Sequence, residues 1–135
     1  MKLLDILGNM GVEWINQRLI WNLYIGQSAY VWVNDGFSDA CEIGRGVRQG
    51  CALTPLLYTI HDEAMMKEAK ENVQERISLA GATVSLIRYA DDKAVVASSQ
   101  RGLQYLMDSI NKVSKEFNMK IIAKKTKDHV YFTSR

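Results

Sequence analysis

Two adjacent carboxylates are the clearest chemical feature of the sequence. Asp91 and Asp92 stand between two short apolar runs, residues 84–89 and 94–97, so both belong to a tight turn between two expected strands. Two such carboxylates repel each other unless a cation lies beside them. Hard carboxylate oxygens are ligands that Mg²⁺ prefers. The alternative is that both are ordinary turn residues, whose side chains bond to the local backbone.

A segment rich in glycine and arginine is the second candidate site. Residues 44–50 read Gly-Arg-Gly-Val-Arg-Gln-Gly. Glycines let a backbone approach a ligand closely, and Arg45 and Arg48 can pair with phosphate oxygens. The segment is not a P-loop, because the Gly-Lys-Ser/Thr ending is absent. The alternative is a flexible connection whose arginines are solvated.

The third feature is a basic segment at the end of the chain. Residues 112–135 carry seven basic and two acidic side chains, whereas the whole chain has a formal net charge of +2. Such a segment suits a polyanionic partner, or it is simply a solvated surface.

Apolar periodicity predicts the elements that precede these residues in the first half of the chain. It indicates helices over about 3–10 and 12–25, with Gly26 as a C-terminal cap. A hairpin follows, with strands at 29–33 and 37–43 around an Asn-Asp-Gly turn. A third helix is expected from Thr54, its N-cap, to about residue 76, with its acidic outer face solvated.

The second half of the chain is expected to hold strands and one long helix. Residues 84–89 and 94–97 have the composition of strands covered on both faces. Residues 103–117 form an amphipathic helix, and short strands are expected at 121–122 and 130–133. This order predicts one α+β domain over residues 1–135.

Composition narrows the class of protein. The 135 residues are 47% apolar, which is enough for one globular core, and no apolar run is long enough to span a bilayer. The two cysteines, Cys41 and Cys51, cannot form a disulfide framework, so we expect buried thiols and an intracellular location. The tryptophans Trp14, Trp21 and Trp32 are expected in the core rather than as base-stacking platforms.

Two strings together resemble one enzyme family. Residues 46–57 read Gly-Val-Arg-Gln-Gly-Cys-Ala-Leu-Thr-Pro-Leu-Leu, and residues 89–92 read Tyr-Ala-Asp-Asp. They resemble motifs B and C of the reverse transcriptases of non-LTR (LINE-type) retrotransposons, and residues 119–127 are similar to motif D. The resemblance implies part of a polymerase palm, a ferredoxin/RRM-like antiparallel sheet packed with helices.

The resemblance also implies a chemistry and its residues. The family copies RNA into DNA with two Mg²⁺ ions, so Asp91 would bind metal and Asp92 would support the metal site. Lys125, or Lys127, would neutralise or protonate pyrophosphate. Tyr89 would lie beside the primer end.

Binding of nucleotide and template is implied for the string at 46–57. Arg48, Gln49 and Gly50 would border the templating base and the incoming nucleotide. The implied partners are an RNA template, a DNA primer and deoxynucleoside triphosphates, with no role for a membrane.

The sequence also departs from the family pattern. It contains no string like motif A, Phe-x-Asp-x-x-x-Ala-Phe-Asp, and nothing similar to the fingers, motif E or the thumb. Asn118 stands where glycine is usual, Ile122 where asparagine is usual, and His61 where an aromatic residue is common. We therefore expect the chain to lack polymerase activity alone and to need the missing segments in cis.

Two alternative interpretations remain. One is a non-catalytic nucleic-acid-binding remnant that uses Arg45, Arg48 and the lysines of 120–127. The other is a decayed gene product without a stable fold.

Overall fold

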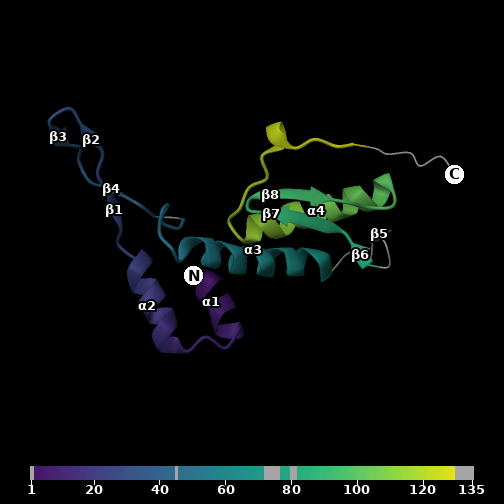
Figure 1. Cartoon of the computed structure of the whole chain (residues 1–135), viewed down its shortest axis with the longest axis horizontal. Coiled ribbons are helices and arrows are strands. Elements are labelled where there is room, and N and C mark those ends of the chain that lie inside the picture. Colours follow the sequence, from purple (N-terminus) through teal and green to yellow (C-terminus); the bar gives the residue numbers. More distant parts are fainter. Residues whose placement is uncertain (1, 45, 72–76, 80–81, 130–135) are drawn as a thin grey trace. The chain divides into compact units, whose positions relative to one another are not determined.

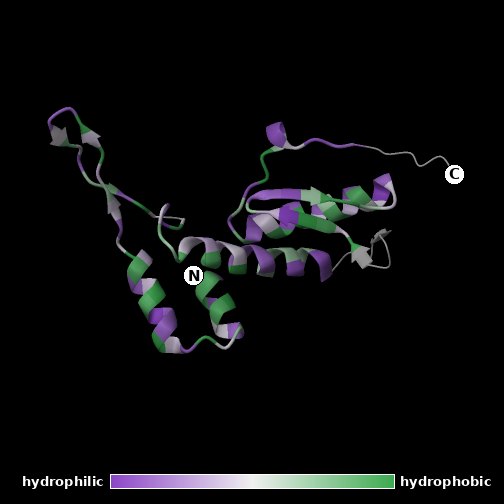
Figure 2. Cartoon of the chain, in the orientation of Figure 1, coloured by the Kyte–Doolittle hydropathy of each residue, from purple (hydrophilic) through white to green (hydrophobic). Residues whose placement is uncertain are grey.

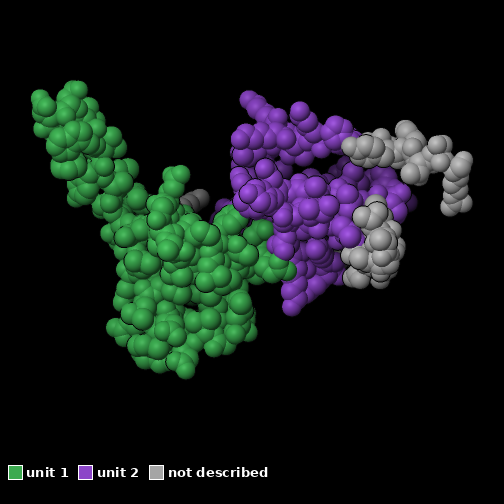
Figure 3. Space-filling model, in the orientation of Figure 1, with its two compact units in different colours: residues 1–64 green, residues 65–135 purple. Residues whose placement is uncertain are grey.

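The computed structural model describes residues 2–44, 46–71, 77–79 and 82–129. These residues form two compact units, 1–64 and 65–135 (Figure 3). Helix α3 (Thr54–Glu71) runs through the boundary between the units. Each unit is described below by itself.

Two short helices begin unit 1. Helix α1 (Lys2–Asn9) and helix α2 (Trp14–Tyr24) pack against each other (Figure 1). Hydrophobic and hydrophilic residues alternate along both, as Figure 2 shows. Helix α1 ends in a Schellman motif: the Val12 N–H donates to the Leu7 carbonyl and the Gly11 N–H to the Gly8 carbonyl, both at 3.0 Å. Gly11 takes the left-handed φ of 83° that this motif needs.

The expected hairpin follows α2 and is built from two nested ladders. Strand β1 (Ser28–Ala29) pairs with β4 (Cys41–Glu42), and β2 (Trp32–Val33) pairs with β3 (Gly36–Phe37). Between the ladders, residues 39 and 40 of the returning strand stand opposite residue 30. Two residues on one strand opposite one on the other form a β-bulge, which bends and twists the hairpin between its two ladders.

Helix α3 begins where expected but differs in its caps and its outer face. Thr54 is the first residue of the helix rather than the N-cap before it, and its hydroxyl donates to the Arg48 carbonyl. Leu57 is fully buried in unit 1, as is Leu7 of α1. Asp62 is only 4% exposed, so the prediction of a solvated acidic face is wrong at this residue. The expected continuation over 72–76 lies outside the described residues.

Unit 2 holds two hairpins and a long helix. Strand β5 (Ile77–Leu79) pairs with β6 (Ala82–Val84), and β7 (Leu86–Tyr89) pairs with β8 (Asp92–Val95). Helix α4 (Gln100–Glu116) packs against β8. Among the described residues of this unit, the buried hydrophobic side chains come from the end of α3, from α4 and from its C-cap; they are Met65, Met66, Ala69, Leu106, Ile110, Val113 and Phe117.

Three sequence predictions need correction. The strand expected over 84–89 is divided at Ser85, and its hairpin is covered on one face rather than both, since Ile87 is 59% exposed. No strand forms at 121–122; a short 3₁₀ helix, η1 (Ala123–Lys125), follows instead. The strand expected at 130–133 lies outside the described residues.

The described elements confirm a mixed fold of helices and small antiparallel sheets, the coarse form of the α+β prediction. The ladders remain four separate two-stranded sheets in the described chain, because no further strand pairs with their edges there. A single domain over 1–135 stays a prediction. Among the described helices, none has the length and apolar character needed to cross a bilayer.

Candidate functional site

The hairpin of β7 and β8 carries the paired carboxylates. Its register joins Tyr89 to Asp92 as the last pair of the ladder, which leaves a two-residue turn, Ala90–Asp91. Ala90 has a φ of 50°, a left-handed value that costs a residue with a Cβ about 1–2 kcal/mol. A positive φ at the first central residue alone is the pattern of a type II′ turn, which suits the twist of a hairpin. Strained backbone of this kind is often kept at functional sites.

Strand alternation separates the two faces of this hairpin. Leu86, Arg88, Lys93 and Val95 are half-buried. The opposite face, with Ile87, Tyr89, Asp92 and Ala94, is exposed.

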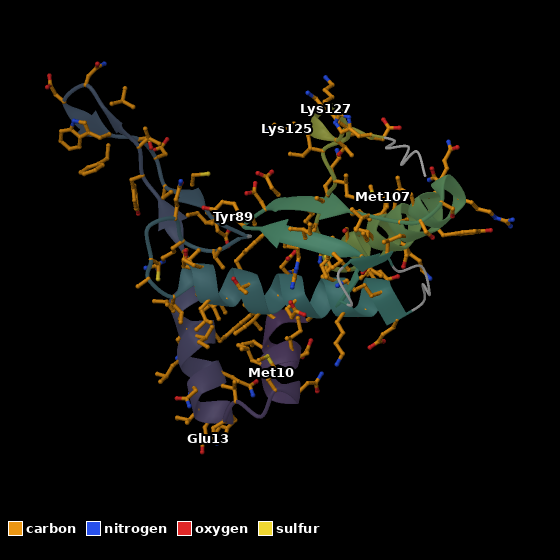
Figure 4. All side chains as sticks on the ribbon, turned by 45° about the vertical axis from the view of Figure 1, so that its right-hand side comes forward. Met10, Glu13, Tyr89, Met107, Lys125 and Lys127 are labelled. Atoms are coloured by element: carbon orange, nitrogen blue, oxygen red, sulfur yellow. The ribbon has the colours of Figure 1, made fainter. Side chains whose placement is uncertain are left out.

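Tyr89 and Asp92 therefore lie opposite each other on the open face, at the end of the ladder. Tyr89 is 84% exposed, and Figure 4 shows it at the tip of the hairpin. Asp91, in the turn itself, is also exposed. Both carboxylates and the phenol are thus presented to solvent, where a ligand can reach all three.

Helix α4 supports this hairpin from its covered side. The helix begins at an N-cap, where Ser99 Oγ accepts the Gly102 N–H at 3.0 Å. Ser109 Oγ donates to the Ala69 carbonyl at 2.7 Å and so joins α4 to the end of α3. Helix α4 therefore packs beneath the half-buried side of the hairpin within unit 2.

The donor chemistry of the tip fits a hard divalent cation in part. Asp91 and Asp92 offer carboxylate oxygens, which Mg²⁺ accepts together with water and phosphate. Among the described residues, however, no group of three or more His, Cys, Asp or Glu side chains gathers in a way that could hold a metal. The pair would hold Mg²⁺ only with further oxygens supplied by a substrate or by other protein residues.

The glycine-arginine segment lies in unit 1, before α3. Gly46 and Gly50 have φ values of 93° and 82°, a backbone conformation that favours glycine. Between them, the Arg48 carbonyl accepts both the Thr54 hydroxyl and, at 3.4 Å, the Cys51 N–H. These bonds fasten one side of the loop to the start of α3. Arg45 lies outside the described residues.

The fastened loop leaves its side chains open. Arg48, Gln49 and Gly50 are all exposed, and no Cβ placed at Gly46 or Gly50 would meet another atom within 4 Å. A ligand can therefore approach the backbone of this loop as well as the Arg48 guanidinium.

Cys51 is a polar feature that the sequence prediction of buried thiols missed. The backbone N–H of Leu53 lowers the pKa of the Cys51 thiol, and desolvation opposes this effect. The Thr54 N–H and the hydroxyls of Tyr24 and Thr54 lower the pKa further. Cys51 is half-buried and Cys41 is exposed, so the prediction is wrong for Cys41. The position of Cys51 just before a helix start was the available signal, since N–H groups converge there.

His61 is also perturbed. Partial burial lowers its pKa below the ordinary value; Asp62 acts in the opposite direction and Lys2 reinforces the lowering. This environment lies in unit 1, on α3.

The basic segment begins at the end of α4. The Met119 N–H donates to the Ser114 carbonyl at 2.8 Å and the Asn118 N–H to the Lys115 carbonyl at 3.1 Å, a second Schellman motif. Asn118 takes a φ of 56°, which asparagine tolerates better than other residues with a Cβ.

Lys125 lies in η1, and Lys127 lies in the segment that follows it (Figure 4). Both side chains are exposed. The Lys125 N–H donates to the Ile122 carbonyl at 2.9 Å, which forms the short turn.

The structure thus brings some predicted site residues together. Tyr89, Asp91 and Asp92 share one hairpin tip in unit 2, and Lys125 belongs to the same unit. Residues 48–50, the other predicted binding residues, form one exposed loop in unit 1.

Comparison with known protein families gives one match. The family described as "Reverse transcriptase (RNA-dependent DNA polymerase)" matches residues 2–131. The match includes the glycine-arginine loop, the carboxylate hairpin and the basic segment up to residue 131.

Proposed function

The chain belongs to the reverse transcriptase (RNA-dependent DNA polymerase) family, and from this premise we propose that it is the part of a non-LTR retrotransposon polymerase that carries motifs B, C and D. The family's reaction joins a deoxynucleotide to a DNA primer under the direction of an RNA template. The observation that carries the proposal for this chain is the β7–β8 hairpin, which exposes Asp91, Asp92 and Tyr89 at one tip on a left-handed turn.

The carboxylate pair is proposed to contribute to a magnesium site of the polymerase palm. Mg²⁺ bound there would neutralise phosphate charge and favour ionisation of the primer hydroxyl. The protein's own contribution is positional: the short ladder holds Asp92 beside Tyr89, and the two-residue turn holds Asp91 next to it. Tyr89 offers a flat face and a hydroxyl against which a primer end can rest.

The loop at 46–50 is proposed to bind the incoming nucleotide and the template base. Its left-handed glycines keep Cβ atoms away from a ligand, and Arg48 supplies a guanidinium for phosphate oxygens. The bond from Thr54 to the Arg48 carbonyl fixes the backbone between these glycines. Lys125 and Lys127 supply positive charge for a polyphosphate product.

We further propose that the 135-residue chain does not extend a primer by itself. Its sequence contains no motif A string, and the hairpin pair has no third carboxylate among the described residues. A full magnesium shell needs about six oxygens, so two side chains leave most of it to other groups. Segments with a further carboxylate, joined in cis, complete the site in this proposal.

Metal binding tests the site apart from activity. Mn²⁺ titrated into ¹⁵N-labelled protein should broaden the amide signals of Tyr89, Asp91 and Asp92 first, because paramagnetic broadening falls steeply with distance. The Asp92→Asn variant should lose this selective broadening. The control variant Asp108→Asn, which replaces an exposed aspartate of α4, should keep it. Equal broadening in Asp92→Asn and the unchanged protein would remove the magnesium site from the proposal.

Template-primer extension with Mg²⁺ or Mn²⁺ tests activity. The chain alone should give no extended primer. Extension that Asp91→Ala abolishes would show that the chain needs no further carboxylate and would overturn the proposal of inactivity.

The second candidate function is nucleic-acid binding without catalysis, favoured by the exposed lysines of the basic segment. Each phosphate contact adds about 0.7 to the slope of log affinity against log salt for single strands. Lys125→Gln with Lys127→Gln should therefore lower the slope for RNA by about 1.4. RNA binding that is indifferent to salt would contradict this function.

A further inference from the structure

We propose that the hairpin of residues 28–42, the aromatic hairpin, is a docking surface for a basic polypeptide segment whose Lys or Arg side chains lie over its aromatic rings. The proposal concerns unit 1 alone and is independent of the polymerase chemistry. It rests on three observations: an ordered aromatic cluster, its exposure, and a local charge of one sign.

The cluster is an ordered arrangement of three rings. Trp32 and Phe37 are directly opposed across the ladder, with ring centroids 4.6 Å apart and planes at 84°. Tyr30 meets the same Phe37 at 6.4 Å and 75°. Both contacts are edge-to-face, the geometry that aromatic pairs prefer. The rings therefore hold one another in fixed orientations, which reduces the entropy that a partner must remove on binding.

The surrounding backbone fixes the cluster further. Asn34 takes a φ of 51° in the turn between the two strands. Beyond the ladder, the Ser38 N–H donates to the Val31 carbonyl at 2.9 Å, and the Val31 N–H donates to Ser38 Oγ at 3.0 Å. The bulge that follows ends the regular pairing next to Tyr30. The cluster thus lies on a short, well-bonded platform.

All three rings are available to a partner. Tyr30 is 59% exposed, Trp32 is 62% exposed and Phe37 is 70% exposed. The sequence prediction that Trp32 lies in the core is therefore wrong in the described chain, and it is wrong also for Trp14 and Trp21, which are 66% and 36% exposed. In the described part of the chain, the hairpin strands pack mainly on each other, so no core forms around these rings.

The charge around the rings selects the partner. Residues 19–44 contain three acidic side chains, Asp35, Asp39 and Glu42, and no Lys or Arg. All three acidic residues are exposed. Aromatic faces attract cations through their quadrupole, and the carboxylates attract the same groups at longer range. A nucleic acid, which also stacks on aromatic rings, is repelled by this charge.

Helix α2 contains a contact of the proposed kind, between an arginine and a tryptophan ring. The Arg18 guanidinium lies 5.9 Å from the centre of the Trp14 ring. Trp32, in contrast, has aromatic neighbours but no cation in the aromatic hairpin, since that segment contains none. A basic segment would supply there what Arg18 supplies to Trp14.

The test uses the whole 135-residue chain and a defined probe, a fluorescein-labelled ten-residue peptide of alternating arginine and glycine. Fluorescence anisotropy gives its Kd at several salt concentrations. Replacing two rings, in Trp32→Ser with Phe37→Ser, should weaken binding about tenfold. The matched control, Trp14→Ser, removes another exposed tryptophan of the same unit and should leave Kd unchanged. Asp35→Asn with Asp39→Asn should weaken binding and reduce its salt dependence.

A second measurement follows binding in the unchanged protein, and a ring variant is used only to assign one signal. The three indole N–H signals of the unchanged protein are followed by NMR during titration. The signal of Trp32, assigned with Trp32→Phe, should move, and those of Trp14 and Trp21 should stay. Three results would overturn the proposal: no movement of Trp32, an equal movement caused by oligouridine, or a movement with protein concentration alone, which would indicate a second copy of the chain as the occupant.

Discussion

Replacing Ala90 by glycine should stabilise the β7–β8 hairpin, although glycine usually weakens the interior of a strand. Ala90 has a φ of 50°, which costs a residue with a Cβ about 1–2 kcal/mol. Glycine removes this cost but makes the unfolded chain more flexible, which returns about 0.5–1 kcal/mol. The net gain is about 0.5–1 kcal/mol. Ala94→Gly is the matched control, because Ala94 lies in β8 with ordinary strand geometry and its loss should destabilise by about the same amount.

Native-state hydrogen exchange reads this prediction at the hairpin itself. The amide protons of β7 and β8 should exchange about two- to fivefold more slowly in Ala90→Gly. This factor is the gain in hairpin stability expressed as a change in the ratio of open to closed states. They should exchange faster in Ala94→Gly. Slower exchange in both variants, or faster exchange in both, would refute the argument from left-handed strain, since that argument depends on opposite signs at the two alanines.

Three other perturbations have defined outcomes. Asn118→Gly should raise the free energy of unfolding by a few tenths of a kcal/mol, and Asn118→Val should lower it by about 1–2 kcal/mol, because the residue holds a left-handed Schellman position; urea unfolding compares the two. His61 has a lowered pKa, so the folded state binds fewer protons than the unfolded chain. The stability that neutral His61 contributes is therefore present above about pH 6.5 and is lost as the pH falls through the folded pKa. His61→Gln should flatten this fall in the free energy of unfolding, measured from pH 8 to 5. The Cys51 thiol also has a lowered pKa, so iodoacetamide should modify it at lower pH than a cysteine in an unstructured peptide. The double variant Thr54→Val with Tyr24→Phe should raise the pH at which the modification occurs. Part of the pKa lowering should persist, because the Leu53 N–H remains.

Local signals in the sequence predicted the elements well. Helical periodicity placed α1, α2 and α4, and the Asn-Asp-Gly turn placed the tip of the aromatic hairpin at Asn34. Asp91 was correctly placed in the turn between two strands, whereas Asp92, predicted in the same turn, begins strand β8. These features are fixed by residues close together in the chain, such as the turn at Ala90–Asp91, so a sequence pattern contains the information for them.

Predictions of burial were less successful, because burial depends on which distant elements meet. Asp62 was placed on a solvated face and is 4% exposed, whereas Trp32 was placed in a core and is 62% exposed. Strand 84–89 was expected to be covered on both faces, but only the face with Leu86 and Arg88 is half-buried. The composition of a strand or helix shows that an apolar face exists, and only the partner elements decide whether it is covered.

Hydrogen-bond partners across loops were also outside the reach of sequence patterns. Thr54 has the residue type of an N-cap, yet its hydroxyl bonds to the Arg48 carbonyl. The neighbouring Leu53 N–H has the largest effect on Cys51, but part of its polar surroundings comes from Tyr24, which lies far away in the sequence. The roles of Asp91, Asp92 and Lys125 in catalysis stay predictions, as do those of the motif B loop and Tyr89.

The two-residue turn between β7 and β8 limits the kinds of mutation that the gene can accumulate without losing the carboxylate tip. Side chains alternate along a strand with a period of two, so one inserted or deleted residue within 86–95 would turn Asp92 toward α4 or leave it without Tyr89 opposite. A substitution at Ile87 or Ala94, on the exposed face, leaves that register intact. Under selection for the site, gene copies should therefore vary in the identity of these hairpin residues but keep the number of codons between Tyr89 and Asp92, and a change in that number marks a copy in which the tip has been lost.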